Sequence, residues 1–331
     1  MRHLPPVVCA AVTALWLCAP ALGGGVVSAF YYPWFGGTVS TGANHWAQDG
    51  HAPPSDIASN YYPALGPYSS GDTAVLDRQM GEIVRAGIDE VSVSWWGWGS
   101  PEDQRLPAVV AAAARHGVEV AVQIEPYNGR TVQSVYADID HLRTLGIDTF
   151  YVYEAFDGLA PADWAAPLDA LRADGLTVFA QTGLVGQAVA GHFSGVYTYD
   201  IVTYGPRTIV RYCAEAHAHG LLCAPSVGPG FDAKRATGNQ VVLPRRGGLT
   251  YDRMWSAAIA AHADRVTITS FNEWQEGTQI EPAAPAARLG TVRYGSYDGS
   301  WGLRGDAASD AYLARTSLWA NRFRAMSVFH K

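Results

Sequence analysis

The sequence predicts a single (β/α)₈ barrel over residues 26–326, with long loops over its C-terminal mouth. Eight short runs rich in Val, Ile, Thr and aromatic residues alternate with Ala-rich segments of helical periodicity. Glycine follows most of the helical segments directly before the next run, as at helix C-termini. An open doubly wound sheet is disfavoured because no G-x-G-x-x-G motif follows the first run.

The expected elements follow in order along the chain, with no shift in composition that would mark a second domain. The strands cover residues 26–32, 90–96, 119–124, 149–154, 176–182, 195–199, 221–227 and 265–271. The helices cover residues 74–86, 106–115, 132–145, 161–173, 208–219 and 251–263, with a short helix at 184–190 and a closing helix at 307–324. Two irregular stretches, 36–71 and 228–250, follow the first and seventh strands and should therefore overhang the C-terminal mouth.

Composition narrows the class of protein. The 331 residues are 48% hydrophobic and 16% charged, which indicates a globular chain and not a disordered one. Thirty acidic against 23 basic residues give a net charge of −7, so the basic stripe of a nucleic-acid binder is not expected. Eleven Trp, 17 Tyr and 10 Phe cluster beside Gly and Pro, a pattern typical of sites for sugars.

Residues 1–21 read as a secretory signal peptide. Arg2 and His3 precede an apolar run at 7–17, and Ala-Pro-Ala follows at 19–21. A membrane anchor is the weaker alternative because the run is too short to span a bilayer, and no later segment is long and apolar enough. We therefore expect an exported protein, secreted or periplasmic, without a membrane span.

The cysteines leave open whether the mature protein contains a disulfide, and the histidines show no metal-binding pattern. Cys9 and Cys18 would leave with the signal peptide, and Cys213 and Cys223 could form one disulfide or remain two buried thiols. No C-x-x-C pair and no His cluster with metal-ligand spacing is present, so neither a metal nor a cofactor is expected.

The ends of the predicted strands supply the candidate chemistry, because the active site of such a barrel lies there. Glu273 and Glu276 follow the eighth strand, where a turn could aim both carboxylates at one bound sugar. Alternatively, one of these two glutamates lies on a surface loop and the other caps a following helix. Glu125 at the end of the third strand could share the site or form a salt bridge with an arginine. Trp95, Trp96 and Trp98 could pack between barrel and helices, but strand alternation should turn at least one outward.

One segment makes a family resemblance visible. Residues 268–281, I-T-S-F-N-E-W-Q-E-G-T-Q-I-E, closely resemble the active-site segment of glycoside hydrolase family 99, the endo-α-1,2-mannosidases and endo-α-1,2-mannanases. Further similar stretches occur in family order, among them F-Y-Y-P-W-F-G at 30–36, S-W-W-G at 94–97, I-E-P-Y at 124–127 and G-V-Y-T-Y at 195–199.

The resemblance implies a barrel that cleaves α-mannosidic chains internally, with retention of configuration and without a metal. It implies that Glu273 deprotonates the 2-hydroxyl of the sugar, giving a 1,2-anhydro intermediate, and that Glu276 is the general acid/base. It also implies a set of sugar-contacting side chains: Tyr32, Trp96, Glu125, Tyr127, Tyr153, Tyr199, Asn272, Trp274 and Arg245. Trp96 hints at mannose in the outermost position on the non-reducing side.

The sequence departs from the family pattern at two places. Gln123 replaces a His often found before I-E-P-Y, and the loop 231–250 diverges from an Arg- and Asn-rich pattern, with Arg245 its one plausible match. The function expected is thus a secreted retaining endo-α-mannosidase acting on α-1,2 bonds of mannans or high-mannose glycans. The rivals are a glycosidase of the same architecture acting on another α-glycan and a barrel that binds glycans without cutting them.

Overall fold

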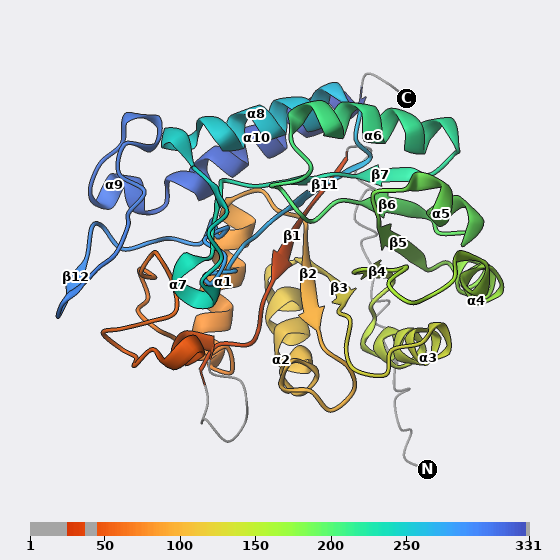
Figure 1. Ribbon diagram of the computed structural model, residues 1–331, viewed down its shortest axis with the longest axis horizontal. Coiled ribbons are helices and arrows are strands. Elements are labelled where there is room, and N and C mark those ends of the chain that lie inside the picture. The colour runs from red at the N-terminus through yellow and green to blue at the C-terminus, as the bar shows by residue number, and fades with distance from the viewer. Residues whose placement is uncertain (1–24, 37–44, 329–331) are drawn as a thin grey trace, which may run out of the picture.

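The computed structural model describes residues 25–36 and 45–328 (Figure 1). A parallel sheet curves around the centre and helices cover its outside. The strands are β1 (Val26–Tyr31), β2 (Glu90–Trp95), β3 (Glu119–Ile124), β4 (Thr149–Val152), β5 (Thr177–Gln181), β6 (Gly195–Tyr197), β7 (Leu222–Ala224), β8 (Ser226–Val227) and β11 (Arg265–Ile268). The predicted signal peptide, with Cys9 and Cys18, lies outside the described residues.

The sheet closes into a barrel through its seventh strand, which is split at Pro225. The segment before the proline, β7, pairs with β6, and the segment after it, β8, pairs with β11. β11 in turn pairs with β1, so the ring is complete. Proline has no backbone N–H for a ladder, which explains the interruption. The (β/α)₈ prediction is confirmed, and β7 and β8 count as one barrel strand.

Eight helices of six or more residues cover the described part of the barrel. They are α1 (Thr73–Arg85), α2 (Pro101–His116), α3 (Val132–Leu142), α4 (Pro161–Ala173), α5 (Val185–Ala190), α6 (Pro206–Ala218), α8 (Leu249–Ala260) and α10 (Ala311–Val328). Asp72, Ser100 and Thr131 accept backbone N–H groups as N-caps of the first three. The second helix begins five residues earlier than predicted, because Ser100 caps it and Pro101 suits its first turn.

The long loops contain short elements that the sequence did not predict. The segment after β1 includes the 3₁₀ turn η2 (His45–Gly50), and the segment after β8 includes the hairpin β9 (Phe231–Asp232) with β10 (Val242–Leu243), the turn α7 (Lys234–Thr237) and η4 (Arg246–Gly248). η3 (Arg143–Leu145) ends the third helix region. A second hairpin, β12 (Arg288–Leu289) with β13 (Val292–Arg293), η5 (Ser300–Gly302) and α9 (Asp306–Ser309) precede the last helix.

Aromatic rings fill the barrel beneath its C-terminal mouth. The rings of Phe30, Tyr151 and Tyr197 lie 5.1–6.0 Å apart between centroids, and all three side chains are buried. Below them Tyr151 donates to Glu90, which forms a 2.8 Å ion pair with Arg265. The interior is therefore closed under the mouth, and a ligand can enter from the loop side.

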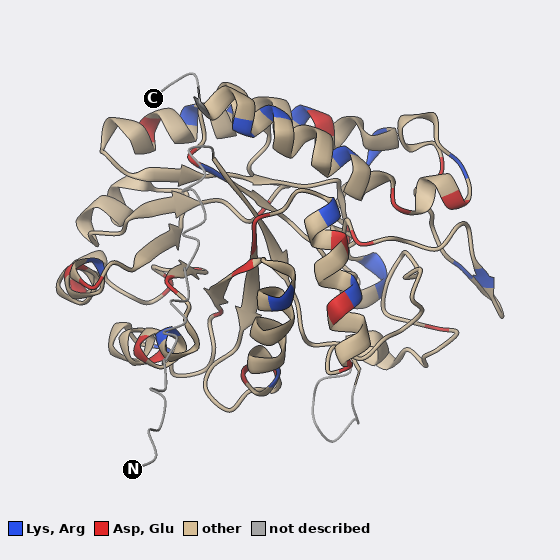
Figure 2. Cartoon of the chain, turned by 180° about the vertical axis from the view of Figure 1, so that it is seen from behind, with Lys and Arg blue, Asp and Glu red and all other residues tan. Residues whose placement is uncertain are grey.

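Cys213 of α6 and Cys223 of β7 are joined in a disulfide, so the bridged alternative is confirmed. In Figure 2 basic and acidic residues lie interspersed along the helices outside the barrel. No helix in the described part of the chain has both the length and the hydropathy needed to cross a membrane.

Candidate active site

A cavity of about 340 Å³ opens at the C-terminal ends of the barrel strands. It is lined by Tyr32, Trp34, His45, Gln48, Trp96, Gln123, Glu125, Pro126, Tyr153, Glu154, Tyr199, Thr237, Glu273, Gln275 and Glu276. Seven of these lining residues were predicted: both glutamates of the pair, Glu125, three tyrosines and Trp96. Carboxylates among aromatic walls suit a sugar, whose hydroxyls need polar partners and whose ring faces are apolar.

The glutamate pair sits on a tight turn after β11. Ser270 Oγ accepts the Glu273 N–H at 2.8 Å, and Asp232 donates its N–H to the Glu276 carbonyl at 2.7 Å. Gly277 has φ of +64°, and a side chain there would come within 3.0 Å of the Asp232 carbonyl. The turn is therefore fixed from both sides, and both carboxylates face the cavity.

Burial raises the pKa of both glutamates of the pair. Glu273 is 2% exposed, and its pKa is raised well above the usual range by burial and by the charges of Glu276 and Glu125. Burial raises the pKa of Glu276 to about 7, opposed by the Tyr199 hydroxyl, which donates to it at 3.4 Å. Because two buried carboxylates repel each other, the ionisation of one favours a proton on the other, so the pair can supply one base and one general acid near neutral pH.

Two tyrosines extend from the acid pair. The Tyr32 and Tyr199 hydroxyls lie 2.5 Å apart, and Tyr199 continues the chain to Glu276. Tyr199 has a φ of +39°, which is uncommon for a residue with a side chain. Thr269 Oγ1 donates to the Tyr199 carbonyl at 2.9 Å. This bond connects Tyr199 to the residue that directly follows β11.

Glu125 forms a second polar centre across the cavity. Its carboxylate accepts from Ser94 Oγ and from Gln123 Nε2, each at 2.7 Å. Burial raises its pKa to about 7, and these two bonds oppose the shift. Neutral donors hold this carboxylate in place of the arginine salt bridge that was the alternative.

Four predicted sugar contacts do not line this cavity. Asn272 is fully buried and bonds the Tyr32 backbone N–H and C=O, at 2.8 and 3.1 Å. Trp274 is fully buried and donates to Glu281. The Tyr127 hydroxyl points to Ser134 and Asp138 on α3. These residues position the strand ends from behind.

Arg245 is the fourth predicted sugar contact that does not line this cavity. Its guanidinium lies between the rings of Tyr61, Tyr297 and Tyr312, 4.6–4.8 Å from each centroid. It donates to the carbonyls of Gly277 and Gln279 at 2.9 and 2.7 Å. It therefore holds the segment that follows Glu276 instead of facing the sugar.

Several lining residues were missed by the sequence reasoning. Trp34 stacks on His45 at 4.3 Å, and burial lowers the pKa of His45 to about 4, so this ring is neutral. Gln275 donates to the His45 carbonyl at 2.8 Å, while its buried Oε1 has no hydrogen-bond partner among residues 25–36 and 45–328. Trp34 follows Tyr32 by two residues, a spacing that could have identified it; the position of His45 depends on the fold of a long loop.

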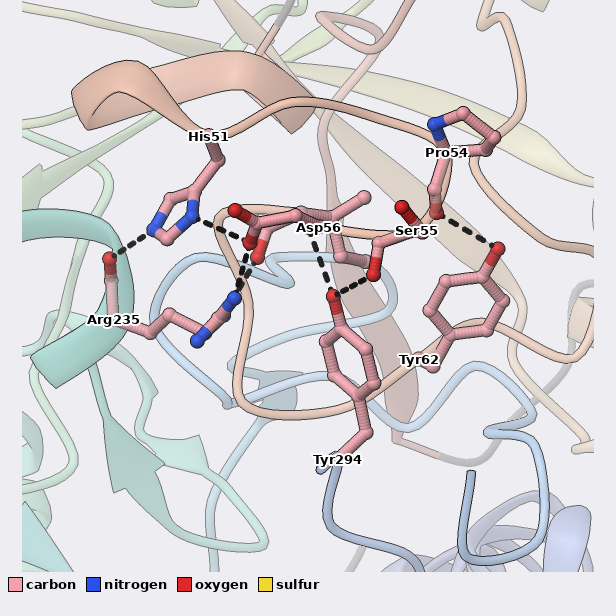
Figure 3. Close-up of polar contacts among 8 residues, drawn as sticks. His51, Pro54, Ser55, Asp56, Tyr62, Arg235 and Tyr294 are labelled. Atoms are coloured by element: carbon pink, nitrogen blue, oxygen red, sulfur yellow. Dashed lines mark hydrogen bonds and ion pairs between the residues drawn. The ribbon is translucent and has the colours of Figure 1, made fainter. Parts of the chain in front are cut away.

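Two loops that form the wall near His45, Gln48 and Thr237 are fastened to each other (Figure 3). His51 contacts Asp56 at 2.8 Å and the Arg235 carbonyl at 2.9 Å. The Arg235 guanidinium pairs with Asp56, and Tyr294 bonds the backbone of Ser55 and Ile57. The loop after β1 and the loop after β8 therefore form one continuous wall.

A second cavity of about 350 Å³ adjoins the first. Both are lined by Tyr153, Tyr199 and Glu276, and the second extends to Phe231, Asn239 and Val241 around the β9–β10 hairpin. Glu273 lines the first cavity, whereas Glu276 lies where the two meet. In residues 25–36 and 45–328, no three His, Cys, Asp or Glu side chains are grouped so as to hold a metal ion.

A barrel with paired buried carboxylates in an aromatic cavity at its mouth has the make-up of a glycoside hydrolase. The chain belongs to glycosyl hydrolase family 99, whose family model matches residues 24–325. It is 32% identical to a Danio rerio glycoprotein endo-alpha-1,2-mannosidase-like protein over 89% of this chain and 77% of the relative, and 30% identical to its Homo sapiens counterpart over 89% and 75%. The solved GH99 endo-alpha-mannosidase from Bacteroides thetaiotaomicron is similar with a TM-score of 0.80 and 30% identity, over 91% of this chain and 98% of that one.

Proposed function

We propose that the protein is a retaining endo-α-mannosidase that cleaves internal α-1,2-mannosidic bonds of mannans or high-mannose glycans. The observation that carries this proposal is the position of Glu273 and Glu276, both buried against aromatic walls at the mouth of the barrel. The relatives named as glycoprotein endo-alpha-1,2-mannosidase-like proteins support the substrate class.

Endo action is supported by the two adjoining cavities. A chain that is cut internally needs space on both sides of the reacting bond. The cavities meet at Glu276, so one side can hold the sugar that reacts and the other the leaving group. This arrangement supports the assignment of Glu276 to protonation of the glycosidic oxygen and of Glu273 to the side of the reacting sugar.

The proposed reaction has two steps with balanced proton transfers. Glu273 takes the proton of the 2-hydroxyl while that oxygen attacks the anomeric carbon; the glycosidic C–O bond breaks, and Glu276 protonates the leaving oxygen. A water molecule, deprotonated by Glu276, then attacks the anomeric carbon from the opposite face. The bond to O2 breaks and O2 regains its proton from Glu273. Two inversions at the anomeric carbon give net retention.

The test is incubation of the purified protein with yeast-type α-mannan and with a glucosylated high-mannose glycan. We expect release of a mannose-containing disaccharide whose new anomeric centre is first observed as α by NMR. Release of glucose oligomers from an α-glucan would favour the rival specificity. Binding of glycans without any cleavage would contradict an enzymatic function.

Export remains part of the proposal. The disulfide between Cys213 and Cys223 suits an oxidising compartment, and the sequence of residues 1–21 suits a signal peptide. N-terminal sequencing of exported protein should give a start after residue 21. A mature chain that still begins at Met1 would contradict it.

A further inference from the structure

The two adjoining cavities are lined by acidic groups, and no described residue that lines either of them is Lys or Arg. The segment 37–44 has no charged residue in its sequence either. His45 adds no positive charge to the first cavity, because burial lowers its pKa to about 4. The acidic lining residues are Glu125, Glu154, Glu273 and Glu276 in the first cavity, with Asp200 added in the second.

The arginines of the surrounding segments are directed to the protein itself. Arg105 and Arg130 each donate to two backbone carbonyls, at 2.6–2.8 Å. Arg235 pairs with Asp56 (Figure 3), and Arg245 is enclosed by three tyrosine rings. An anionic group on a bound sugar would therefore meet carboxylates among the lining side chains and no guanidinium or ammonium group.

Asp200 is the acidic residue that lines only the second cavity, which we assign to the leaving group. Its Oδ1 accepts the backbone N–H groups of Val202 and Thr203 at 2.8 and 3.1 Å. Its charge also raises the pKa of Glu276, so its field reaches the group assigned to protonate the leaving oxygen. A substituent on the leaving sugar therefore lies within the same field.

This field treats neutral and anionic sugars differently. The hydroxyl groups of a neutral sugar can donate to carboxylates, and such charge-assisted bonds are strong. A phosphate, sulfate or carboxylate group cannot donate in this way when it is ionised. Two like charges several ångströms apart near a protein surface repel strongly enough to change a binding constant by about tenfold.

We propose that this site selects uncharged mannan and disfavours chains with phosphate, sulfate or uronate groups beside the bond that is cut, and that Asp200 determines this preference on the leaving-group side. The inference rests on the proposed function, because it takes the second cavity as the place of the leaving sugar. It goes beyond that function, since neutral and anionic mannans can share the same α-1,2 linkage.

The test compares two α-1,2-linked manno-oligosaccharides that differ only at C6 of the leaving sugar. One carries a carboxylate there and the other a carboxamide, which has nearly the same shape and no charge. The measured quantity is the ratio of kcat/KM for the amide to that for the acid, at neutral pH, with the cut bond identified from the product masses. We expect a ratio of about tenfold at low ionic strength.

Salt separates a charge effect from a shape effect. The screening length falls from about 30 Å at an ionic strength of about 0.01 M to about 3 Å at about 1 M. The ratio should therefore decrease toward one as salt is added. A preference for the amide that does not respond to salt would overturn the electrostatic origin.

Asp200→Asn should lower the ratio about threefold at low ionic strength. Asn keeps an acceptor for the N–H groups of Val202 and Thr203, so the local turn is preserved. The change also removes one cause of the raised pKa of Glu276, but both substrates depend on the same Glu276, so this effect cancels in the ratio. Glu215→Gln is the matched control, because Glu215 is an exposed acid on α6 that lines neither cavity.

The outcomes distinguish this inference from the proposed function. Equal kcat/KM for acid and amide in the unchanged protein would overturn the selection against charge. A ratio that stays constant in Asp200→Asn, or that falls equally in Glu215→Gln, would overturn the role of Asp200. If the unchanged protein cleaves neither the amide substrate nor α-mannan, the proposed function itself has failed.

Discussion

The indole N–H of Trp274 donates to the carboxylate of Glu281 at 2.7 Å, and both side chains are buried behind the catalytic turn. Glu281 also accepts from Tyr68 and from Gln79, each at 2.7 Å. These partners come from the loop after β1 and from α1, so one carboxylate joins three distant segments. Because Trp274 stands between Glu273 and Glu276, its anchor fixes the turn that carries the acid pair.

Trp274→Phe should therefore destabilise the fold and disturb the site. The ring volume is mostly kept, but one hydrogen bond to a buried carboxylate is lost, which costs about 1–3 kcal/mol of unfolding free energy. We expect a lower denaturation midpoint in urea and a reduced kcat. Trp96→Phe is the control for stability, since Trp96 is exposed and its midpoint should barely move. An unchanged midpoint in Trp274→Phe would show that the Glu281 contact is dispensable.

Stability should fall as the pH rises through neutrality. Burial raises the pKa of Glu125 and Glu276 to about 7 and that of Glu281 to about 8, from an ordinary value of 4.5. A raised carboxyl pKa means that the folded state binds more protons than the unfolded state above pH about 4.5. The stabilisation is therefore complete below about pH 4.5 and is lost progressively as the pH rises from there to 7 or 8.

Urea unfolding between pH 5.5 and 8.5 measures this effect. Each such group contributes a slope of at most about 1.4 kcal/mol per pH unit. Glu281→Gln, which cannot titrate, should give a flatter profile between pH 5.5 and 8 than the unchanged protein. Stability that rises over this range would contradict the assigned directions.

The barrel could be predicted from the sequence because its signals are local. Runs of β-branched residues and glycines at helix ends mark the strands and helices, and the residues at the strand ends then follow from the fold class. The break at Pro225 was visible in the sequence, yet its role in closing the ring depends on pairings with β6 and β11.

The predicted sugar contacts that do not line the cavity have environments that depend on how the loops fold. Trp274 was expected to face the sugar, but its side chain turns inward to Glu281 and packs near Trp46. Arg245 was expected at the substrate, but three tyrosines from separate segments enclose it. Neither environment has a local signature, because the contacts exist only after the loops have folded around the mouth.

Loss of the disulfide should lower stability without affecting the chemistry. Cys213 and Cys223 are separated by 10 residues, and closing a loop of that size stabilises a fold by roughly 2–4 kcal/mol. The Cys213→Ser/Cys223→Ser double variant should unfold at lower urea concentration. Neither cysteine lines the cavity, so kcat/KM should be retained. Equal midpoints with and without the bridge would rule out a stabilising role.

Tyr199→Phe should move the alkaline limb of the pH–rate profile. The Tyr199 hydroxyl lowers the pKa of Glu276, which burial has raised to about 7. Without the hydroxyl, Glu276 should keep its proton to higher pH, so the fall in kcat/KM on the alkaline side should begin later. Tyr153→Phe is the matched control because Tyr153 lines the same cavity. The alkaline limb of the pH–rate profile of this variant should stay in place. A shift toward lower pH in Tyr199→Phe would reverse the assigned effect of this bond.

The Glu273→Gln and Glu276→Gln variants should lose catalytic rate in different ways. Glu276 lies where the two cavities meet and is assigned to protonate the leaving group. A substrate with an activated leaving group, such as a fluoride, needs little protonation, so Glu276→Gln should recover much of the rate of the first step on it, measured as the initial release of fluoride. Glu273 is assigned to deprotonate the 2-hydroxyl, which is required for any leaving group. Glu273→Gln should therefore stay slow, about 10²–10⁴-fold, on both the fluoride and the polymer.

The comparison needs binding and folding as controls. Glu273→Gln should still bind mannosides in calorimetry, and both variants should remain folded, because Gln is nearly isosteric with Glu. If Glu273→Gln responds to the leaving group as Glu276→Gln does, the two roles are assigned the wrong way round. If neither change slows hydrolysis, the pair is not catalytic. Glu125 would then be the next carboxylate to test, since it is buried in the same cavity and its pKa is raised to about 7.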